Sequence, residues 1–479
     1  MSTESPVPTG MAPADQLLTS VFPGEIGVAR VDITPPAGIY ARNWGRSHHD
    51  TAVGIHRPLT ATVLVIAGPG GDPVLLLVAA DLGWWKRRED ERRLRGGLQA
   101  ALGLPEAGVL LSLSHTHAGP SLYREDAAKT GGELIEPYLD QVRDRLVAAA
   151  RAARGNRRPA RLSWRYGRCD LARNRDLPEP GTRRHVVGYH APAAADDTVL
   201  VGRIEDAGDG RLLASVVNYA CHPTTLAWDN RLISPDFPGA MRETVETATG
   251  APCLFLQGAS GELAPAEQYC GDVAVADRHG RRLGHAVLGV MESWSERLQV
   301  FDHVIESGAA LAVTRTSSVR SSNALGASVQ PVVLPLKPMP TVAEIEAKLA
   351  GCTDRALSER LWRQRGVRRI VGEGDSLDLP LWIWRVGEAC VVASPGEAYS
   401  QLQTALRQHF PGRPIVVLNV TNGYAGYLPP REHAGRDQYS VWQSPYPPGA
   451  LETLIDAAVL RLERVLTTPT PGNLSPTLS

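Results

Sequence analysis

The interpretation of this chain starts from one stretch, Val109-Leu-Leu-Ser-Leu-Ser-His115-Thr-His117-Ala-Gly-Pro120. Its first five residues are mostly apolar and predict a short buried strand, which runs out into two histidines and a Gly-Pro pair. Side chains at positions i and i+2 of a strand point the same way, so both imidazoles can leave the strand end toward one point. A shared metal fits this arrangement, because neutral imidazole is a common protein metal ligand. The same pattern fits equally well a turn in which the two histidines form only hydrogen bonds.

The composition is that of an ordinary globular protein. The chain has 479 residues, a formal net charge of −1 and 43% hydrophobic residues. The length suits about three average domains, or one large domain. No basic run indicates nucleic acid as a partner, and no apolar window is long enough to be a transmembrane segment. The oligomeric state stays open.

The N-terminal residues and the cysteines indicate the cellular compartment of the protein. The first twenty residues lack the charged and apolar regions of a secretory signal, so we expect a cytoplasmic protein. Six scattered cysteines form no CxxC pair and fit free thiols in a reducing compartment, although one disulfide among them stays open.

The order of apolar runs predicts the fold class. Residues 60–67 and 74–80 form a hairpin pattern around Gly-Pro-Gly-Gly-Asp-Pro, and 86–102 form a helix pattern that ends at Gly103. Hairpins are frequent and no strict βαβ rhythm appears. We therefore predict a mixed α/β (α+β) fold, with mixed, largely antiparallel sheets surrounded by helices. The predicted units are a flexible lead-in at 1–24, one large catalytic domain at 25–466 and a disordered tail at 467–479.

Polar residues of catalytic type follow several predicted strands. His115, His222 and Glu397 each stand where an apolar strand stops. Loops at the ends of rigid strands commonly carry functional sites. Two histidines and one carboxylate suit a catalytic zinc, which takes about three protein ligands and keeps a position for water. The alternative for Glu397 is a helix cap, because carboxylates favour helix N-termini.

Short motifs surround these positions in a fixed order. The most specific motif is Ser114-His-Thr-His-Ala-Gly-Pro120. The others, in chain order, are Asp32-Ile-Thr-Pro, Asn174-Arg175, Asn218-Tyr-Ala-Cys-His222 with Asp236-Phe-Pro-Gly, Pro395-Gly-Glu397, Asn422-Gly-Tyr-Ala-Gly-Tyr427 and Tyr439. In this order they resemble the N-terminal catalytic domain of the neutral, non-lysosomal ceramidases, which are zinc amidases that cleave the N-acyl bond of ceramide.

The resemblance implies a zinc site and a set of groups around the reacting carbonyl. The implied zinc ligands are His115, His222, Glu397 and Tyr427. The implied catalytic groups are His117, Arg175 and Tyr439. A zinc ion would activate water against the carbonyl carbon. His117 would take the water proton and return it to the leaving amine, and the other two would donate hydrogen bonds to the oxyanion.

Two departures bear on the substrate. The family segment Gly-Asp-Val-Ser-Pro stands here as Gly261-Glu-Leu-Ala264-Pro, so a methyl group replaces the family serine. The immunoglobulin-like C-terminal domain and the signal peptide of true ceramidases have no counterpart in this sequence. We therefore expect a soluble, bacterial-type relative that acts on a small-molecule or lipid-like N-acyl substrate, and both ceramide and a different N-acyl compound stay open as that substrate.

Three functions remain in competition. The first is zinc-dependent hydrolysis of a linear amide. The second is a zinc-dependent ester or lactone hydrolase, or an acyltransferase that forms amides, and Ala264 is the feature to weigh. The third is a binding protein without turnover. Outside this set, Trp84 and Trp85 are assigned to core or interface packing, and a loop at 37–55 either borders the site or connects strands at the surface.

Overall fold

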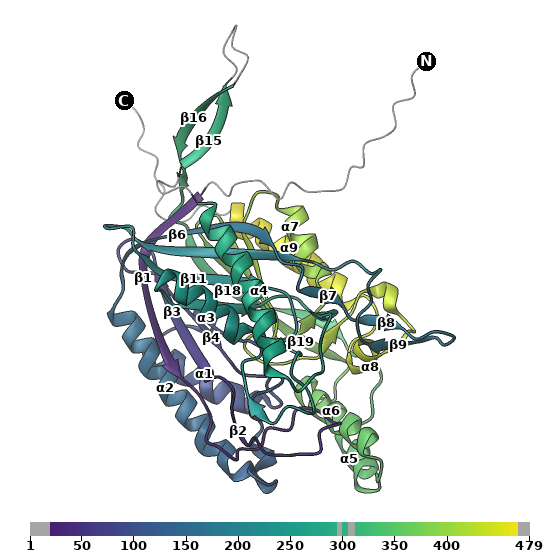
Figure 1. Cartoon of the computed structure of the whole chain (residues 1–479). Helices are drawn as coiled ribbons and strands as arrows, with labels where there is room; N and C mark the ends of the chain where they lie inside the picture. The colour runs from purple at the N-terminus through teal and green to yellow at the C-terminus, as the bar shows by residue number, and fades with distance from the viewer. Residues whose placement is uncertain (1–19, 295–298, 305–311, 468–479) are drawn as a thin grey trace, which may run out of the picture.

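The computed structural model describes residues 20–294, 299–304 and 312–467 (Figure 1). Of the predicted lead-in, residues 1–19 lie outside the described residues, as do 468–479 of the predicted tail. Residues 20–24 already belong to strand β1 (Ser20–Asp32), so this strand begins before the predicted domain boundary at residue 25. Within the described residues, none of the helices combines the length and apolar character needed to cross a bilayer.

A mixed sheet of nine strands forms the larger half of the fold. Antiparallel pairs fill the middle of the sheet, and parallel pairs join β4 to β5 and β11 to β13 at its two edges. The order across the sheet is β13 (Cys253–Gln257), β11 (Leu212–Tyr219), β10 (Thr198–Asp206), β6 (Arg158–Arg168), β1, β3 (Thr60–Ala67), β4 (Val74–Ala80) and β5 (Val109–Leu113), and β17 (Arg320–Ser321) pairs with β1.

A second sheet of four strands packs face to face with the first. Its order is β18 (Leu325–Pro335), β19 (Ser376–Val386), β20 (Ala389–Ala393) and β22 (Ile415–Leu418). Side chains alternate along each strand. In β20, Val391 and Ala393 face the nine-stranded sheet, whereas Cys390 and Val392 face the outer helices. Both faces of these strands are therefore buried, which explains their continuous apolar runs.

Helices cover both outer faces, so the fold has four layers (Figure 1). Helices α1 (Arg88–Leu102) and α2 (Ile135–Gly155) cover one part of the nine-stranded sheet, and α3 (Phe237–Thr249) and α4 (Val273–Glu292) cover another. Helices α7 (Gln401–His409) and α9 (Ala450–Thr467) cover the four-stranded sheet. The predicted class, a mixed α/β fold with helices around mixed sheets, is confirmed.

Shorter elements complete the chain. Helices α5 (Val342–Ala350) and α6 (Arg355–Val371) pack against each other. The others are β2 (Gly54–Ile55), β7 (Ala172–Asn174), β8 (Asp176–Pro178), β9 (Arg184–Val187), β12 (Leu232–Ile233), β14 (Leu263–Pro265), β15 (Gln299–Val304), β16 (Val313–Ser318), β21 (Glu397–Ala398), β23 (Tyr427–Leu428), β24 (Asp437–Gln438) and α8 (Tyr439–Gln443).

Two buried asparagines join the sheets beside the ends of their strands. Asn218 at the end of β11 donates to the carbonyl of Val417 in β22 at 2.9 Å. Asn422, beyond the end of β22, accepts from the backbone N–H of Leu111 in β5 at 2.8 Å and donates to the Val109 carbonyl at 2.8 Å. Buried amides need such partners. The loops that follow β5, β11 and β22 are thereby held at one place.

Candidate metal and catalytic site

His115 and His117 leave β5 through a strained turn. The strand ends at Leu113, and His115 has a positive φ of 67°, which is uncommon for a residue other than glycine. The His115 backbone N–H donates to the Leu82 carbonyl at 2.9 Å, which holds the turn. The ring centroids of the two histidines lie 5.0 Å apart. The imidazoles therefore meet as predicted, but a turn brings them together and not the alternation of a strand.

Backbone carbonyls orient the imidazoles of His115 and His222. The Nδ1 atom of His222 lies 2.7 Å from the carbonyl oxygen of Ser260. The Nδ1 atom of His115 lies 3.3 Å from the carbonyl oxygen of Gly83. A carbonyl only accepts, so each Nδ1 carries the hydrogen and each Nε2 keeps its lone pair. This pattern is typical of histidines that bind a metal through Nε2.

Glu397 is placed by a small parallel sheet. It belongs to β21, where it pairs in register with Tyr427 of β23, and its N–H donates to the Gly426 carbonyl at 2.9 Å. Helix α7 begins only at Gln401. The alternative that Glu397 caps a helix is therefore wrong, and its carboxylate points to the histidines instead.

The ligand atoms stand at distances that suit a tetrahedral metal. The Oε2 atom of Glu397 lies 3.3 Å from Nε2 of His115 and 3.0 Å from Nε2 of His222. Ligands at about 2.0–2.1 Å from a tetrahedral zinc are about 3.3 Å from one another. The three histidines, His117 included, also offer ligand atoms that all lie within 4.8 Å of one another.

Unpartnered nitrogen atoms support the same interpretation. Among the described residues, Nε2 of His115 and both ring nitrogens of His117 are buried without a hydrogen-bond partner. Buried polar atoms in native proteins are normally satisfied, and an ion is one explanation for exceptions. The residues present therefore fit a bound metal.

Burial sets the charge of these groups. Desolvation is the main reason that the pKa of His222 falls to about 3, and the neighbouring Arg175 lowers it further. Desolvation and the nearby histidines hold the pKa of His117 well below its usual value. Burial would raise the pKa of Glu397, but His115 and His222 outweigh it and keep that pKa well below its usual range. At neutral pH His117 and His222 are thus neutral and Glu397 is ionised, the forms in which these groups bind metals.

Tyr427 and Arg175 form a second, buried layer. The hydroxyl oxygen of Tyr427 accepts from Nη2 of Arg175 at 3.1 Å, and the same nitrogen donates to the Gly261 carbonyl at 2.8 Å and lies 3.2 Å from Nε2 of His222. Arg175 is 5% exposed. Its charge therefore lies against the two predicted ligands Tyr427 and His222.

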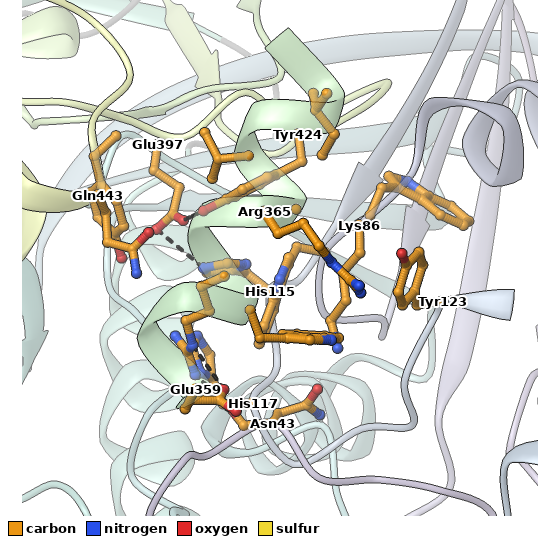
Figure 2. A pocket seen from close by; sticks show the side chains of 18 of the residues that line it. Asn43, Lys86, His115, His117, Tyr123, Glu359, Arg365, Glu397, Tyr424 and Gln443 are labelled. Carbon is orange, nitrogen blue, oxygen red and sulfur yellow. Dashed lines mark hydrogen bonds and ion pairs between the residues drawn. The ribbon is translucent and has the colours of Figure 1, made fainter. Parts of the chain in front are cut away.

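One pocket collects most of the predicted residues (Figure 2). His115, His117, Glu397, Tyr427 and Tyr439 line it together, whereas His222 and Arg175 are buried beside it. The rest of the lining is largely aromatic and cationic. It includes Trp84, Trp85, Lys86, Tyr123, Trp362, Arg363, Arg365 and Tyr424.

Sequence reasoning missed three kinds of residue. Tyr424 donates to Oε1 of Glu397 at 2.8 Å, although only its neighbour Tyr427 was predicted as a ligand. Trp84 was assigned to packing, but its ring lies 4.8 Å from that of His117. Trp44 of the 37–55 loop lies 5.0 Å from the same ring, so this loop borders the site. Helix α6 forms a pocket wall, and its lining residues are 359, 362, 363, 365, 366, 367 and 370. Most of them recur at helical spacing, which was the signal that the sequence offered.

The segment that departs from the family motif lies behind the site. Ala264 is 1% exposed in β14, which pairs with β7. Glu262 accepts from the Ser400 backbone N–H at 3.0 Å and from the Ser400 hydroxyl. Burial raises the pKa of Glu262 to about 7. A carboxyl group that is largely protonated in the fold thus supports the turn before α7.

Sequence comparison finds two curated relatives. The neutral ceramidase of Pseudomonas aeruginosa is 27% identical over 252 residues, which cover 51% of this chain and 37% of that protein. The neutral ceramidase of Oryza sativa subsp. japonica is 26% identical over 242 residues, which cover 48% of this chain and 30% of that protein. No protein-family model matches. The matched part thus spans about a third of each relative.

Comparison with solved structures gives a matching fold. The crystal structure of neutral ceramidase from Pseudomonas aeruginosa matches with a TM-score of 0.66 at 19% identity, over 92% of this chain and 75% of that one. This chain is a divergent relative of the neutral ceramidases. A ceramidase structure complexed with C2 matches with the same TM-score and identity, over 95% and 78%. The neutral ceramidase fold therefore extends over nearly all of the chain, and the predicted resemblance is confirmed.

Proposed function

We propose that this chain is a zinc-dependent hydrolase that cleaves the amide bond of a small or lipid-like N-acyl compound. The observation that carries the proposal is the approach of one carboxylate oxygen of Glu397 to Nε2 of both His115 and His222, at 3.3 and 3.0 Å. The relation to neutral ceramidases supports the amide bond as the target. We further propose Tyr427 as the fourth zinc ligand.

The metal and His117 have different roles in the proposed reaction. When bound, zinc supplies a Lewis acid that lowers the pKa of water to about 7 and polarises a carbonyl. His117 is neutral and has two unpartnered ring nitrogens, so it can accept the proton of the attacking water. It can then donate that proton to the nitrogen of the leaving amine. General acid–base groups of this kind contribute about 10²–10⁴-fold to rate.

Tyr439 and Arg175 stabilise negative charge in this proposal. Tyr439 lines the pocket together with His117 and donates its hydroxyl hydrogen to the oxyanion. Arg175 acts from the buried side, where its positive charge lies against the Tyr427 hydroxyl. One oxyanion donor contributes about 10²–10³-fold to kcat.

Ester hydrolysis is the second candidate. A buried methyl group at Ala264 stands where the family motif has a serine hydroxyl, in a strand next to Asn174 and Arg175. If that hydroxyl helps amide cleavage, its replacement favours the more reactive ester bond. Acyl transfer to an amine would use the same groups in reverse.

The test compares two substrates with one acyl chain, the octanoyl amide of aminomethylcoumarin and the octanoyl ester of methylumbelliferone. We expect turnover of the amide, about one zinc per chain by elemental analysis, and loss of activity in phenanthroline that added zinc restores. The variant His115→Ala should lose both zinc and turnover. The exposed residue His285 of helix α4 gives the matched control His285→Ala, which should lose neither.

Other outcomes of this test favour a different function. Turnover of the ester alone favours the second candidate. Zinc without turnover of either substrate favours a binding protein. A His115→Ala variant that keeps full zinc and full activity contradicts the proposed ligand set.

A further inference from the structure

Helix α6 supplies a guanidinium to the wall of the proposed active site. Seven residues of this helix line the pocket, and Arg363 stands among them. In Figure 2, Glu359 and Arg365 of the same helix are drawn in the pocket that also holds the catalytic histidine His117. Sequence motifs gave α6 no role, and the proposed mechanism does not use it.

Arg363 is fixed on three sides by hydrogen bonds. Its Nε donates to Oε1 of Glu359, one helical turn earlier, at 3.0 Å. Its Nη2 donates to the backbone carbonyl of Asn43 at 2.8 Å. Its Nη1 donates to the hydroxyl oxygen of Tyr439 at 2.8 Å. The planar fork of arginine suits such a three-point arrangement, and lysine does not reproduce it.

The bond to Tyr439 has a direct chemical consequence. A phenol has one hydrogen and can accept on its oxygen at the same time. Because Arg363 donates to that oxygen, the hydrogen of Tyr439 is available to an acceptor elsewhere, and Tyr439 lines the pocket. A charged donor also polarises the O–H bond, since hydrogen bonds in a chain strengthen one another.

We infer that Arg363 is a positioning residue that acts through Tyr439, turning its hydroxyl hydrogen toward the oxyanion of the substrate, and that Glu359 holds Arg363 in place. The inference rests on the proposed function. The side chains of Arg363 and Glu359 are each 22% exposed, so the pair is partly desolvated. Removal of Glu359 would therefore leave a cation with an incomplete set of partners.

The test is a double-mutant cycle on zinc-loaded protein with the octanoyl amide of aminomethylcoumarin. Tyr439→Phe should lower kcat about 100-fold or more, the range for a lost oxyanion donor. Arg363→Met should lower kcat about 10-fold, with KM changed less than about threefold, since the loss lies in the transition state. The double variant should match Tyr439→Phe within about threefold, because residues that act as a unit are not additive.

Two further variants separate positioning from structure. Arg363→Lys keeps the charge and one donor, so it should retain more activity than Arg363→Met. Arg360→Met removes an arginine from the same helix that packs over the ring of Trp442 outside the pocket lining, and it should keep full activity. Zinc content and the urea midpoint should stay unchanged in Arg363→Met.

Octanohydroxamate binding gives a readout that needs no turnover. The oxygens of the hydroxamate should take the place of the acyl oxygens of the substrate. Titration calorimetry should therefore show that Arg363→Met and Tyr439→Phe each bind octanohydroxamate about tenfold more weakly than the parent. Equal binding by all variants would overturn the inference. So would multiplicative effects in the cycle, or loss of zinc from Arg363→Met. If His115→Ala stays fully active, the proposed function fails; if His115→Ala is inactive and Arg363→Met is normal, only this inference fails.

Discussion

Glu262→Gln should change how the stability of this protein depends on pH. Glu262 is 7% exposed, and burial raises the pKa of its carboxyl group from 4.5 to about 7. Below pH 4.5 this group is protonated in both the folded and the unfolded chain. Between pH 4.5 and 7 the folded chain binds more protons than the unfolded chain, so the free energy of unfolding falls as the pH rises.

The size of the effect follows from the two pKa values. The difference corresponds to about 3 kcal/mol, at 1.36 kcal/mol for each pKa unit. Glutamine resembles the protonated carboxyl group and does not titrate. The free energy of unfolding of Glu262→Gln, minus that of the parent, should therefore increase by about 3 kcal/mol from pH 4.5 to pH 8. A constant offset from changed hydrogen bonds with Ser400 cancels in this comparison.

Urea unfolding monitored by tryptophan fluorescence at several pH values measures this difference. Both proteins keep the same metal ligands, so the pH dependence of metal binding cancels as well. Glu267→Gln is the matched control, because its carboxylate lies just beyond β14 and is 59% exposed. The difference in the free energy of unfolding between Glu267→Gln and the parent should not change with pH. A difference for Glu262→Gln that changes by less than about 1 kcal/mol over this range refutes the reasoning.

Three further substitutions test other contacts. Tyr424→Phe removes the hydroxyl that donates to Glu397, and zinc affinity measured by chelator competition should fall about 10–100-fold; unchanged affinity would contradict this role. Asn422→Ala leaves two buried backbone groups of β5 without partners and should cost about 2–4 kcal/mol in urea unfolding; a cost below about 1 kcal/mol would mean that water replaces the amide. Gly280→Ala places a methyl carbon 2.4 Å from a carbonyl oxygen of α3 and should cost about 1–3 kcal/mol in thermal unfolding, whereas Gly289→Ala, which meets no neighbour, should not.

Local patterns predicted the fold class because they act over short distances. The run of β-branched residues at 60–80, broken by glycine and proline, does form the β3–β4 hairpin, and Gly103 does end α1 in a left-handed conformation. The packing of a four-stranded sheet against a nine-stranded sheet was not predicted. It depends on contacts such as that between Asn218 and Val417, which are 199 residues apart and leave no local signal.

The candidate site was predicted from motifs rather than from spacing. His115, His222 and Glu397 do converge; their places at strand ends suggested the set, and the family resemblance supported it and added Tyr427. Residues outside the motifs were missed, because Arg363 and Trp84 look like ordinary surface and core residues in sequence. The positive φ of His115 also escaped sequence analysis, since nothing local requires it.

The proposed metal site is assembled from two distant parts of the chain, and this has a consequence during synthesis. His115 and His222 follow strands of the first sheet, whereas Glu397 and Tyr427 belong to the later part of the chain. A nascent polypeptide still attached to the ribosome can present both imidazoles long before the carboxylate emerges. The proposed site can therefore be completed only after the segment that carries Glu397 has been synthesised and folded.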